Sequence, residues 1–227
     1  MPLGFLRSSI FGANAVGLLQ VGSFVGMIFI LTIYLQQVRS YSALSTGLAF
    51  LPMGIVFIVV SGFLSARLVN RFGVKPTLIW GMALQTIGYL FLSPISLTES
   101  YIAGLLGPTL LVGLGTGLGF TATTISALTG TRRGEEGLAS GLINTSRQIG
   151  GPIGLAVLLT VTNLETPSST GQLAVQSSAV MAMMTGFGYA FLAAAVLTGI
   201  GIIVTALLKK ERHRQAEVMV APTVDQR

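Results

Sequence analysis

Cysteine is absent from the chain, and histidine occurs once, at His213. Disulfide bonds, thiolate metal sites and metal sites built from several histidines are therefore excluded. Charge is also scarce, because Asp, Glu, Lys and Arg make up only 9% of the 227 residues, against about 25% in soluble domains. A soluble fold of this size cannot cover so much apolar sequence with so few charges. The sequence predicts a protein whose main solvent is lipid, and it predicts no cofactor and no metal.

Acidic residues are missing from every long apolar stretch. The seven acids are Glu99, Glu135, Glu136, Glu165, Glu211, Glu217 and Asp225. Proton-driven transport generally needs a titrating group within the membrane, and these stretches contain no such group. A Walker A pattern is also missing, so ATP is not the expected energy source.

The chain instead contains six long apolar runs, and its mean hydropathy is +0.80. A helix needs about 20 apolar residues to cross a bilayer core, and the runs lack the alternating polarity of barrel strands. The sequence therefore predicts an all-α integral membrane protein, with a six-helix bundle in residues 1–210 and a short cytoplasmic tail at 211–227. The predicted helices are 11–36, 45–67, 76–96, 101–126, 137–162 and 179–208.

Basic residues gather on one side of this predicted topology, and the other side holds only Arg39. The first side holds Arg7, Arg67, Arg71, Lys75, Arg132, Arg133, Lys209, Lys210, Arg212 and Arg214. The positive-inside rule then places both termini in the cytoplasm, and the location we predict is a bacterial inner membrane. The net charge of +6 follows from this topology, and no nucleic-acid partner is needed to explain it.

The segment RLVNRFGVKP, residues 67–76, is one of the predicted basic loops, and Gly73 allows a tight reversal within it. A positive-inside loop alone accounts for its charge. Its spacing also resembles the loop signature G-x-L-a-D-r-x-G-r-k of the major facilitator superfamily, here carried by Asn70, Arg71, Gly73 and Lys75. Asn70 stands where the family has an acid, which fits the degenerate copy in the C-terminal half of that family.

Two further segments resemble the same family. Residues 34–54 look like the junction of the first two C-terminal-half helices in its fourteen-helix drug:proton antiporters, and residues 134–158 look like the fifth helix of that half. The resemblance implies one half of a major facilitator fold and a transporter, not an enzyme. The implied activity is proton-coupled efflux of drugs or other small lipophilic compounds.

The implied partners are the lipid bilayer, a small-molecule substrate, and either a missing N-terminal half or a second copy of the chain. Two other interpretations stay open at this stage. One is a free-standing half-transporter that acts as a dimer, and the other is a non-transporting membrane subunit.

Four polar residues inside the predicted helices are the substrate-cavity candidates: Gln20, Thr116, Asn144 and Arg147. By the resemblance, the first and fourth helices line the substrate path. Arg147 lies about 15 Å along its helix, and a charge so deep should face protein or water. The alternative for Arg147 is that it snorkels to the cytoplasmic surface, and the alternative for Gln20 is an interhelical hydrogen bond.

Glycines and prolines mark expected contacts and bends. Gly113 and Gly117 form a small-xxx-small pair, which favours close packing of two helices in lipid. Gly150, Gly151 and Pro152 resemble a worn antiporter motif, and Pro152 should bend the helix because it removes a backbone donor.

Overall fold

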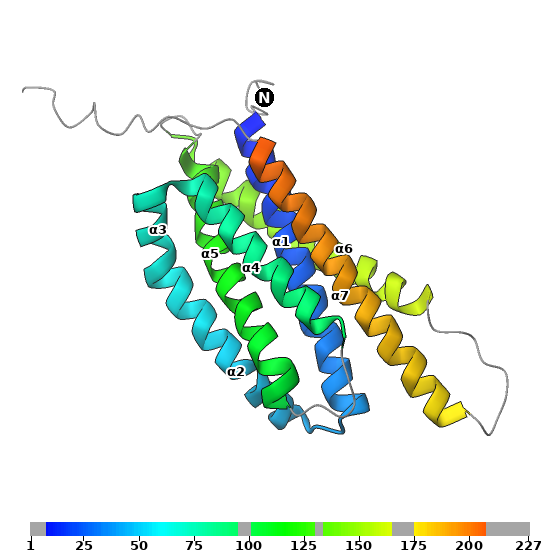
Figure 1. Cartoon of the computed structure of the whole chain (residues 1–227). Coiled ribbons are helices and arrows are strands. Elements are labelled where there is room, and N and C mark those ends of the chain that lie inside the picture. Colours follow the sequence, from blue (N-terminus) through cyan, green and yellow to red (C-terminus); the bar gives the residue numbers. More distant parts are fainter. Residues whose placement is uncertain (1–7, 95–100, 130–133, 165–174, 208–227) are drawn as a thin grey trace, which may run out of the picture.

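The computed structural model describes residues 8–94, 101–129, 134–164 and 175–207, and every element within them is helical. Six long helical columns lie side by side in an elongated bundle (Figure 1). The predicted all-α class is therefore confirmed. The elements, with η for π-helical segments, are α1 (Ser8–Ile33), η2 (Tyr34–Val38), α2 (Ala43–Val59), η3 (Val60–Leu64), α3 (Ser65–Phe72), α4 (Val74–Leu92), η4 (Tyr101–Leu106), α5 (Gly107–Thr129), α6 (Glu136–Leu164) and α7 (Val175–Leu207).

The described part of each predicted apolar run lies in one of these columns, whereas residues 95, 96 and 208 lie outside the described residues. The six columns are not equally apolar. Four helices are long and apolar enough to cross a membrane, at Phe11–Val38, Ala43–Phe72, Gly104–Thr129 and Met181–Leu207. α4 and α6 fall outside that set, since they carry polar side chains such as Gln85 in mid-helix. Membrane crossing by all six helices stays a prediction.

The predicted basic loop at 67–76 is mostly helical in the structure. α2, η3 and α3 run on without a break, and α3 ends only at Phe72. The chain offers no glycine or proline between Ala66 and Phe72, so nothing stops the helix earlier. Gly73 then takes φ +93°, a left-handed value that favours glycine, and α4 begins one residue later with Pro76 in its first turn.

Glycine-lined crossings bring neighbouring helices into backbone contact. A Cβ built on Gly154 of α6 would lie 2.2 Å from the carbonyl carbon of Gly22 in α1. A Cβ on Gly115 of α5 would lie 2.3 Å from the carbonyl oxygen of Gly81 in α4. Any larger side chain would push these helices apart, so the glycines set how closely the bundle packs in lipid.

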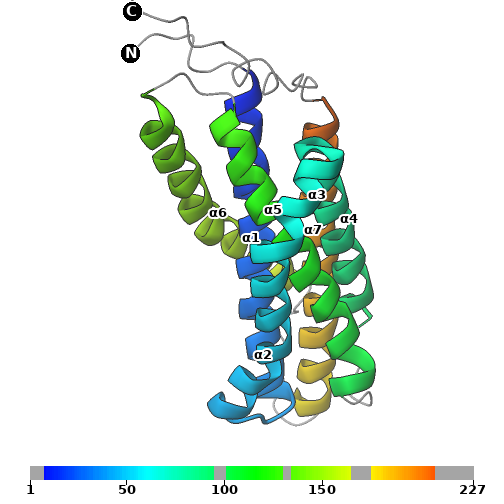
Figure 2. The same ribbon diagram turned by 90° about the vertical axis from the view of Figure 1, so that its left-hand side faces the viewer.

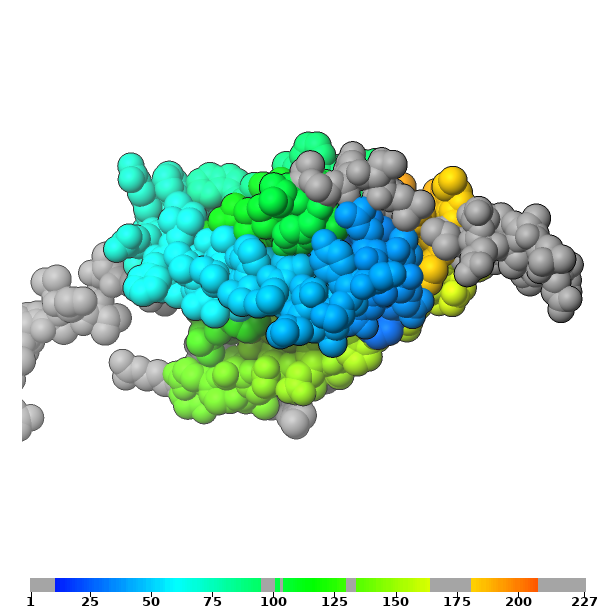
Figure 3. All heavy atoms as spheres, turned by 90° about the horizontal axis from the view of Figure 1, so that it is seen from below, coloured from blue at the N-terminus to red at the C-terminus, as the bar shows by residue number. Residues whose placement is uncertain are grey.

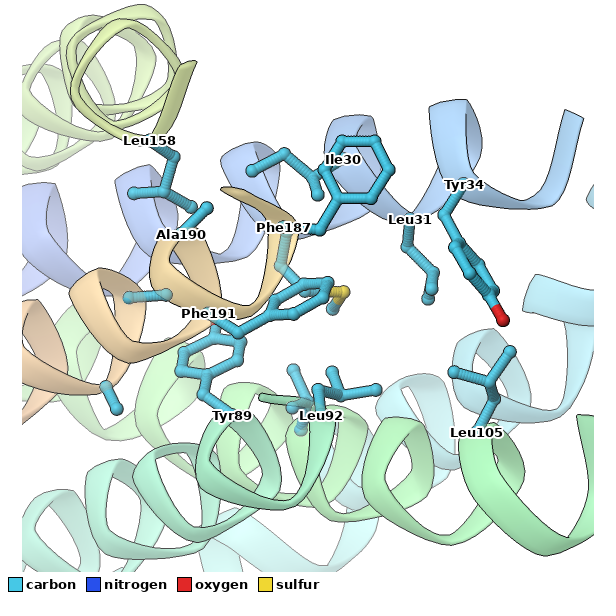
Figure 4. Close-up of a cluster of buried hydrophobic side chains, with 14 of the residues drawn as sticks. Ile30, Leu31, Tyr34, Tyr89, Leu92, Leu105, Leu158, Phe187, Ala190 and Phe191 are labelled. Carbon is cyan, nitrogen blue, oxygen red and sulfur yellow. The ribbon is translucent and has the colours of Figure 1, made fainter. Parts of the chain in front are cut away.

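Aromatic and aliphatic side chains fill the bundle interior at the end away from the labelled N-terminus. Tyr34, Tyr89, Phe187 and Phe191 are all buried in this cluster (Figure 4). The rings of Tyr34 and Phe187 meet edge to face, with centroids 6.4 Å apart, which is a favoured aromatic geometry. The cluster ties α1, α4 and α7 together beneath the polar residues described next.

α6 lies on one side of the bundle (Figure 2). It packs mainly against α1 and also against α7, and at one end it leans away from the other helices (Figure 2). From below, it forms a ridge along one side of the molecule, beside the α2 column (Figure 3). α5 lies between these two columns and contacts both.

Candidate functional site

Arg147 lies at the junction of α1, α5 and α6, and only 7% of it is exposed. Its Nη2 donates hydrogen bonds to the Phe120 carbonyl oxygen (2.6 Å) and to Thr124 Oγ1 (2.9 Å). Its guanidinium also lies over the Phe120 ring, 3.9 Å from the centroid. The side chain thus reaches across to α5, and it does not extend along α6 towards the helix end.

The aromatic contact continues from α5 to α2. The Phe57 ring meets the Phe120 ring nearly at right angles, with centroids 5.8 Å apart. Arg147, Phe120 and Phe57 therefore form a row that links α6, α5 and α2. Phe120 remains 37% exposed, so part of its surface is open to a neighbouring molecule.

Gln20 lies at the contact of α1 with α4 and α5, and it is 1% exposed. Its side-chain Nε2 donates to the backbone carbonyl oxygen of Thr116 (3.4 Å). The backbone carbonyl oxygen of Gln20 accepts from Ser23 Oγ (3.0 Å). Among the described residues, its Oε1 is buried without a hydrogen-bond partner. This placement matches the interhelical alternative for Gln20, and a cavity role stays a prediction.

Gln85 completes this polar cluster, and it is not among the residues predicted from the sequence. Its Nε2 donates to the Tyr89 hydroxyl (2.8 Å) and to the Gln20 carbonyl oxygen (3.4 Å). Gln85 Oε1 is a second buried acceptor that lacks a partner in the described part of the chain. The signal for it was available, because Gln85 is the only amide in the run from Val74 to Leu92.

The other two cavity candidates, Thr116 and Asn144, differ in their placement. Thr116 is buried in α5, and its hydroxyl donates back to the Val112 carbonyl oxygen (2.7 Å). Asn144 is exposed on α6, whereas Arg147 one turn later is buried. The structure thus brings Gln20 close to the Thr116 backbone, but it places Asn144 on a different surface.

The glycine motifs lie at helix crossings. Cβ atoms on Gly113 and Gly117 would approach the carbonyl oxygens of Met53 and Phe57 to 2.9 and 3.0 Å. A Cβ on Gly150 would meet the Leu18 carbonyl oxygen at 2.5 Å.

The other two residues of the antiporter-like motif, Gly151 and Pro152, are less crowded than Gly150. A Cβ on Gly151 would lie in ordinary contact with Val25, at 3.6 Å. Pro152 is exposed within α6, which continues past it to Leu164.

The loop motif lies at the end of α3 and the start of α4. Asn70 and Arg71 are exposed on α3, and the Arg71 guanidinium lies 5.4 Å from the Phe72 ring centroid. Lys75 Nζ donates to the Ala206 carbonyl oxygen (2.6 Å) in the last turn of α7, where a positive charge is favoured by the helix dipole. The motif therefore fastens α4 to α7.

Taken together, the described helices define a multi-pass membrane protein with polar residues at its helix contacts. The sequence model described as Major Facilitator Superfamily matches residues 3–155. The chain belongs to the major facilitator superfamily, a class of membrane transporters.

Several proteins named for antibiotic export or drug resistance are similar to the chain. It is 36% identical to the cephamycin export protein CmcT of Amycolatopsis lactamdurans over 195 residues, which cover 83% of this chain and 40% of that protein. It is 29% identical to the puromycin resistance protein pur8 of Streptomyces alboniger over 212 residues, or 92% of this chain and 41% of that protein. The multidrug resistance protein Stp of Mycobacterium tuberculosis is 36% identical over 133 residues, which cover 59% of this chain and 24% of that protein. The chain therefore spans about two fifths of the first two relatives' length.

Proposed function

We propose that the chain forms the C-terminal half of a drug exporter driven by the proton gradient, with both termini cytoplasmic in a bacterial inner membrane. The observation that carries this proposal is the match to the cephamycin export protein, which covers 83% of this chain but only 40% of that protein. The names of the relatives concern cephamycin, puromycin and multiple drugs, which favours efflux of small organic compounds.

The proton-coupling group is expected to come from the other half. Among the described residues, only Glu135 and Glu136 are acidic, and they lie at the start of α6. The remaining lengths of the described helices carry neither a carboxylate nor a histidine. Alternating access in this superfamily rocks one half against the other around a shared site. The acid that couples transport to protons can therefore lie in the half that this bundle does not form.

The outer faces of α2 and α6 supply a surface for such a second half. Leu51, Ile55 and Ile58 are exposed on α2, and Ile149 and Ile153 are exposed on α6. These two columns flank α5, with its partly exposed Phe120. The exposed apolar faces favour contact with lipid or with another helical bundle over contact with water.

The test is a replacement experiment in bacteria that lack their own drug exporters. This chain replaces the matched 195-residue segment of the cephamycin export protein, and the cells are compared with cells that produce this chain alone. Cephamycin accumulation is measured with and without a protonophore. We expect the chimera to lower accumulation only while the proton gradient is present, and we expect the chain alone to leave accumulation unchanged.

Two outcomes would contradict the proposal. A chimera that reaches the membrane but exports nothing would show that the chain does not serve as this half of an exporter. Gradient-dependent export by the chain alone would favour a free-standing half-transporter that acts as a dimer.

A further inference from the structure

Arg147 carries a buried positive charge whose described contacts are all neutral. Its Nη2 is bound to a carbonyl oxygen and a hydroxyl, and one face of the guanidinium is covered by the Phe120 ring. These groups solvate the cation, but none of them cancels its charge. A charge held away from water normally needs a partner of opposite sign.

The described residues offer no carboxylate to Arg147. Glu135 and Glu136 are the only acids among them, and 11 residues of helix, or about 16 Å, separate Glu136 from Arg147. The Glu136 carboxylate accepts from the Gly134 backbone N–H (2.8 Å), so it is bound at the start of its own helix. The counter-charge for Arg147 must come from another part of the protein or from a ligand.

One edge of the guanidinium has an unused donor. Arg147 Nε is buried and has no hydrogen-bond partner among the described residues. This Nε–H can donate one charge-assisted hydrogen bond to a carboxylate oxygen, whereas both N–H groups of Nη2 already have acceptors. The cost of leaving a buried donor unpaired would be removed when such a ligand binds.

One face of the guanidinium lies against aromatic groups. Phe120 is partly exposed beside the guanidinium, and Phe57 extends the aromatic surface to α2. A ligand with an aromatic ring next to an anionic group would match both features, since rings pack well against rings in offset or edge-to-face geometry.

We propose that Arg147 and Phe120 bind the anionic, aromatic part of transported compounds, with the carboxylate on Arg147 and the ring against Phe120. This inference rests on the proposed export function and names a substrate class for it. A Cβ on Gly17 would lie in ordinary contact with Arg147 Cγ, at 3.7 Å, so α1 packs against the stem of this side chain.

The experiment measures binding to the full chain in nanodiscs of zwitterionic lipid. The probe is 4-fluorophenylacetate, and its neutral analogue 4-fluorophenylacetamide controls for partition into lipid, as do empty nanodiscs. Fluorine NMR line widths report binding even when affinity is weak. The variants are Arg147→Ala, Arg147→Lys and Phe120→Leu. The matched control is Arg71→Ala, which removes an exposed arginine that also contacts a phenylalanine ring.

We expect the wild type to bind the acid more tightly than the amide. Loss of a charge-assisted hydrogen bond should weaken acid binding roughly 10- to 100-fold in Arg147→Ala. Arg147→Lys should retain part of the affinity because lysine keeps the charge but lacks the planar fork. Phe120→Leu should weaken binding a few-fold, roughly 2- to 10-fold, and Arg71→Ala should bind as the wild type does. If Arg147→Ala does not fold, the other two site variants decide the question.

Equal binding of acid and amide, or wild-type affinity in a folded Arg147→Ala, would overturn the proposal. It would also fail if the export chimera of the preceding section did not bind the acid, because a carboxylate of the other half would then already occupy Arg147. Acid binding without export by that chimera would contradict the proposed function alone. Export of cephamycin without acid binding would contradict this inference alone.

Discussion

Gln85 occupies the middle of α4, and together with Gln20 it joins three helices. It donates to Tyr89 on its own helix and to the backbone of Gln20 on α1, and Gln20 in turn donates to the Thr116 backbone on α5. Lipid offers no alternative hydrogen-bond partner to these groups. The cluster therefore favours one rotation of α1, α4 and α5 about their axes over the others.

We expect Gln85→Met to lower the free energy of unfolding by about 0.5–2 kcal/mol, the range of interhelical hydrogen bonds in membranes. Methionine conserves the side-chain volume but leaves the Tyr89 hydroxyl without its 2.8 Å donor. The measurement is detergent-induced unfolding followed by circular dichroism. Gln36→Met is the matched control, because Gln36 is exposed at the end of the α1 column, and it should unfold as the wild type does. Equal stability of the two variants would show that the cluster does not hold the helices together.

At the scale of elements, the crossing of α1 and α6 depends on glycine. Gly22 and Gly154 are so close that a single Cβ on Gly154 would overlap the Gly22 backbone, at 2.2–2.4 Å from three of its atoms. Gly150 makes the same kind of contact one turn earlier, against Leu18. α6 relies on this seam, because α1 is its main neighbour.

Gly154→Ala should therefore destabilise the bundle by about 1–3 kcal/mol or more, the cost of overpacking a tight contact. Gly141→Ala on the same helix is the control, since a Cβ there would meet nothing within 4 Å. Alanine's higher helix propensity should make that control equal to or slightly more stable than the wild type. Unfolding of both variants is measured in the same detergent series. A Gly154→Ala protein as stable as Gly141→Ala would contradict the packing argument.

The apolar runs made the helices predictable, because hydropathy depends on each run alone. The contacts between helices were harder to predict from the sequence. The sequence predicted a motif at Gly150, Gly151 and Pro152 with a bend at Pro152, and the contact of Gly150 with the α1 backbone became visible only in the structure. The partners of Arg147 could not be read from its own helix, because they depend on how α5 is rotated when it packs. The helical course of residues 67–72 differs from the predicted loop, which was based on charge, because no glycine or proline lies between Ala66 and Phe72.

At the scale of the whole molecule, the α2–η3–α3 column provides a direct test of topology. It runs unbroken from Ala43 to Phe72, 30 residues or about 45 Å, so it is long enough to span a bilayer. Exposed Ser40 lies just before one end of the column, and exposed Asn70 lies near the other. If the column crosses the membrane, these two positions lie on opposite sides.

The excess of Lys and Arg near Asn70 predicts that its side is cytoplasmic and that Ser40 faces outward. The chain contains no cysteine, so Ser40→Cys and Asn70→Cys each introduce a single reactive thiol. An impermeant maleimide added to intact spheroplasts should label the Ser40→Cys protein, whereas the Asn70→Cys protein should react only after the cells are opened. The unmodified chain is the blank, and both variants should label fully in detergent. Labelling of Asn70→Cys alone would reverse the orientation, and labelling of both in intact spheroplasts would show that the column does not cross. Either result would contradict the prediction that both termini are cytoplasmic. That prediction depends on the same unequal distribution of Lys and Arg between the two ends of the bundle.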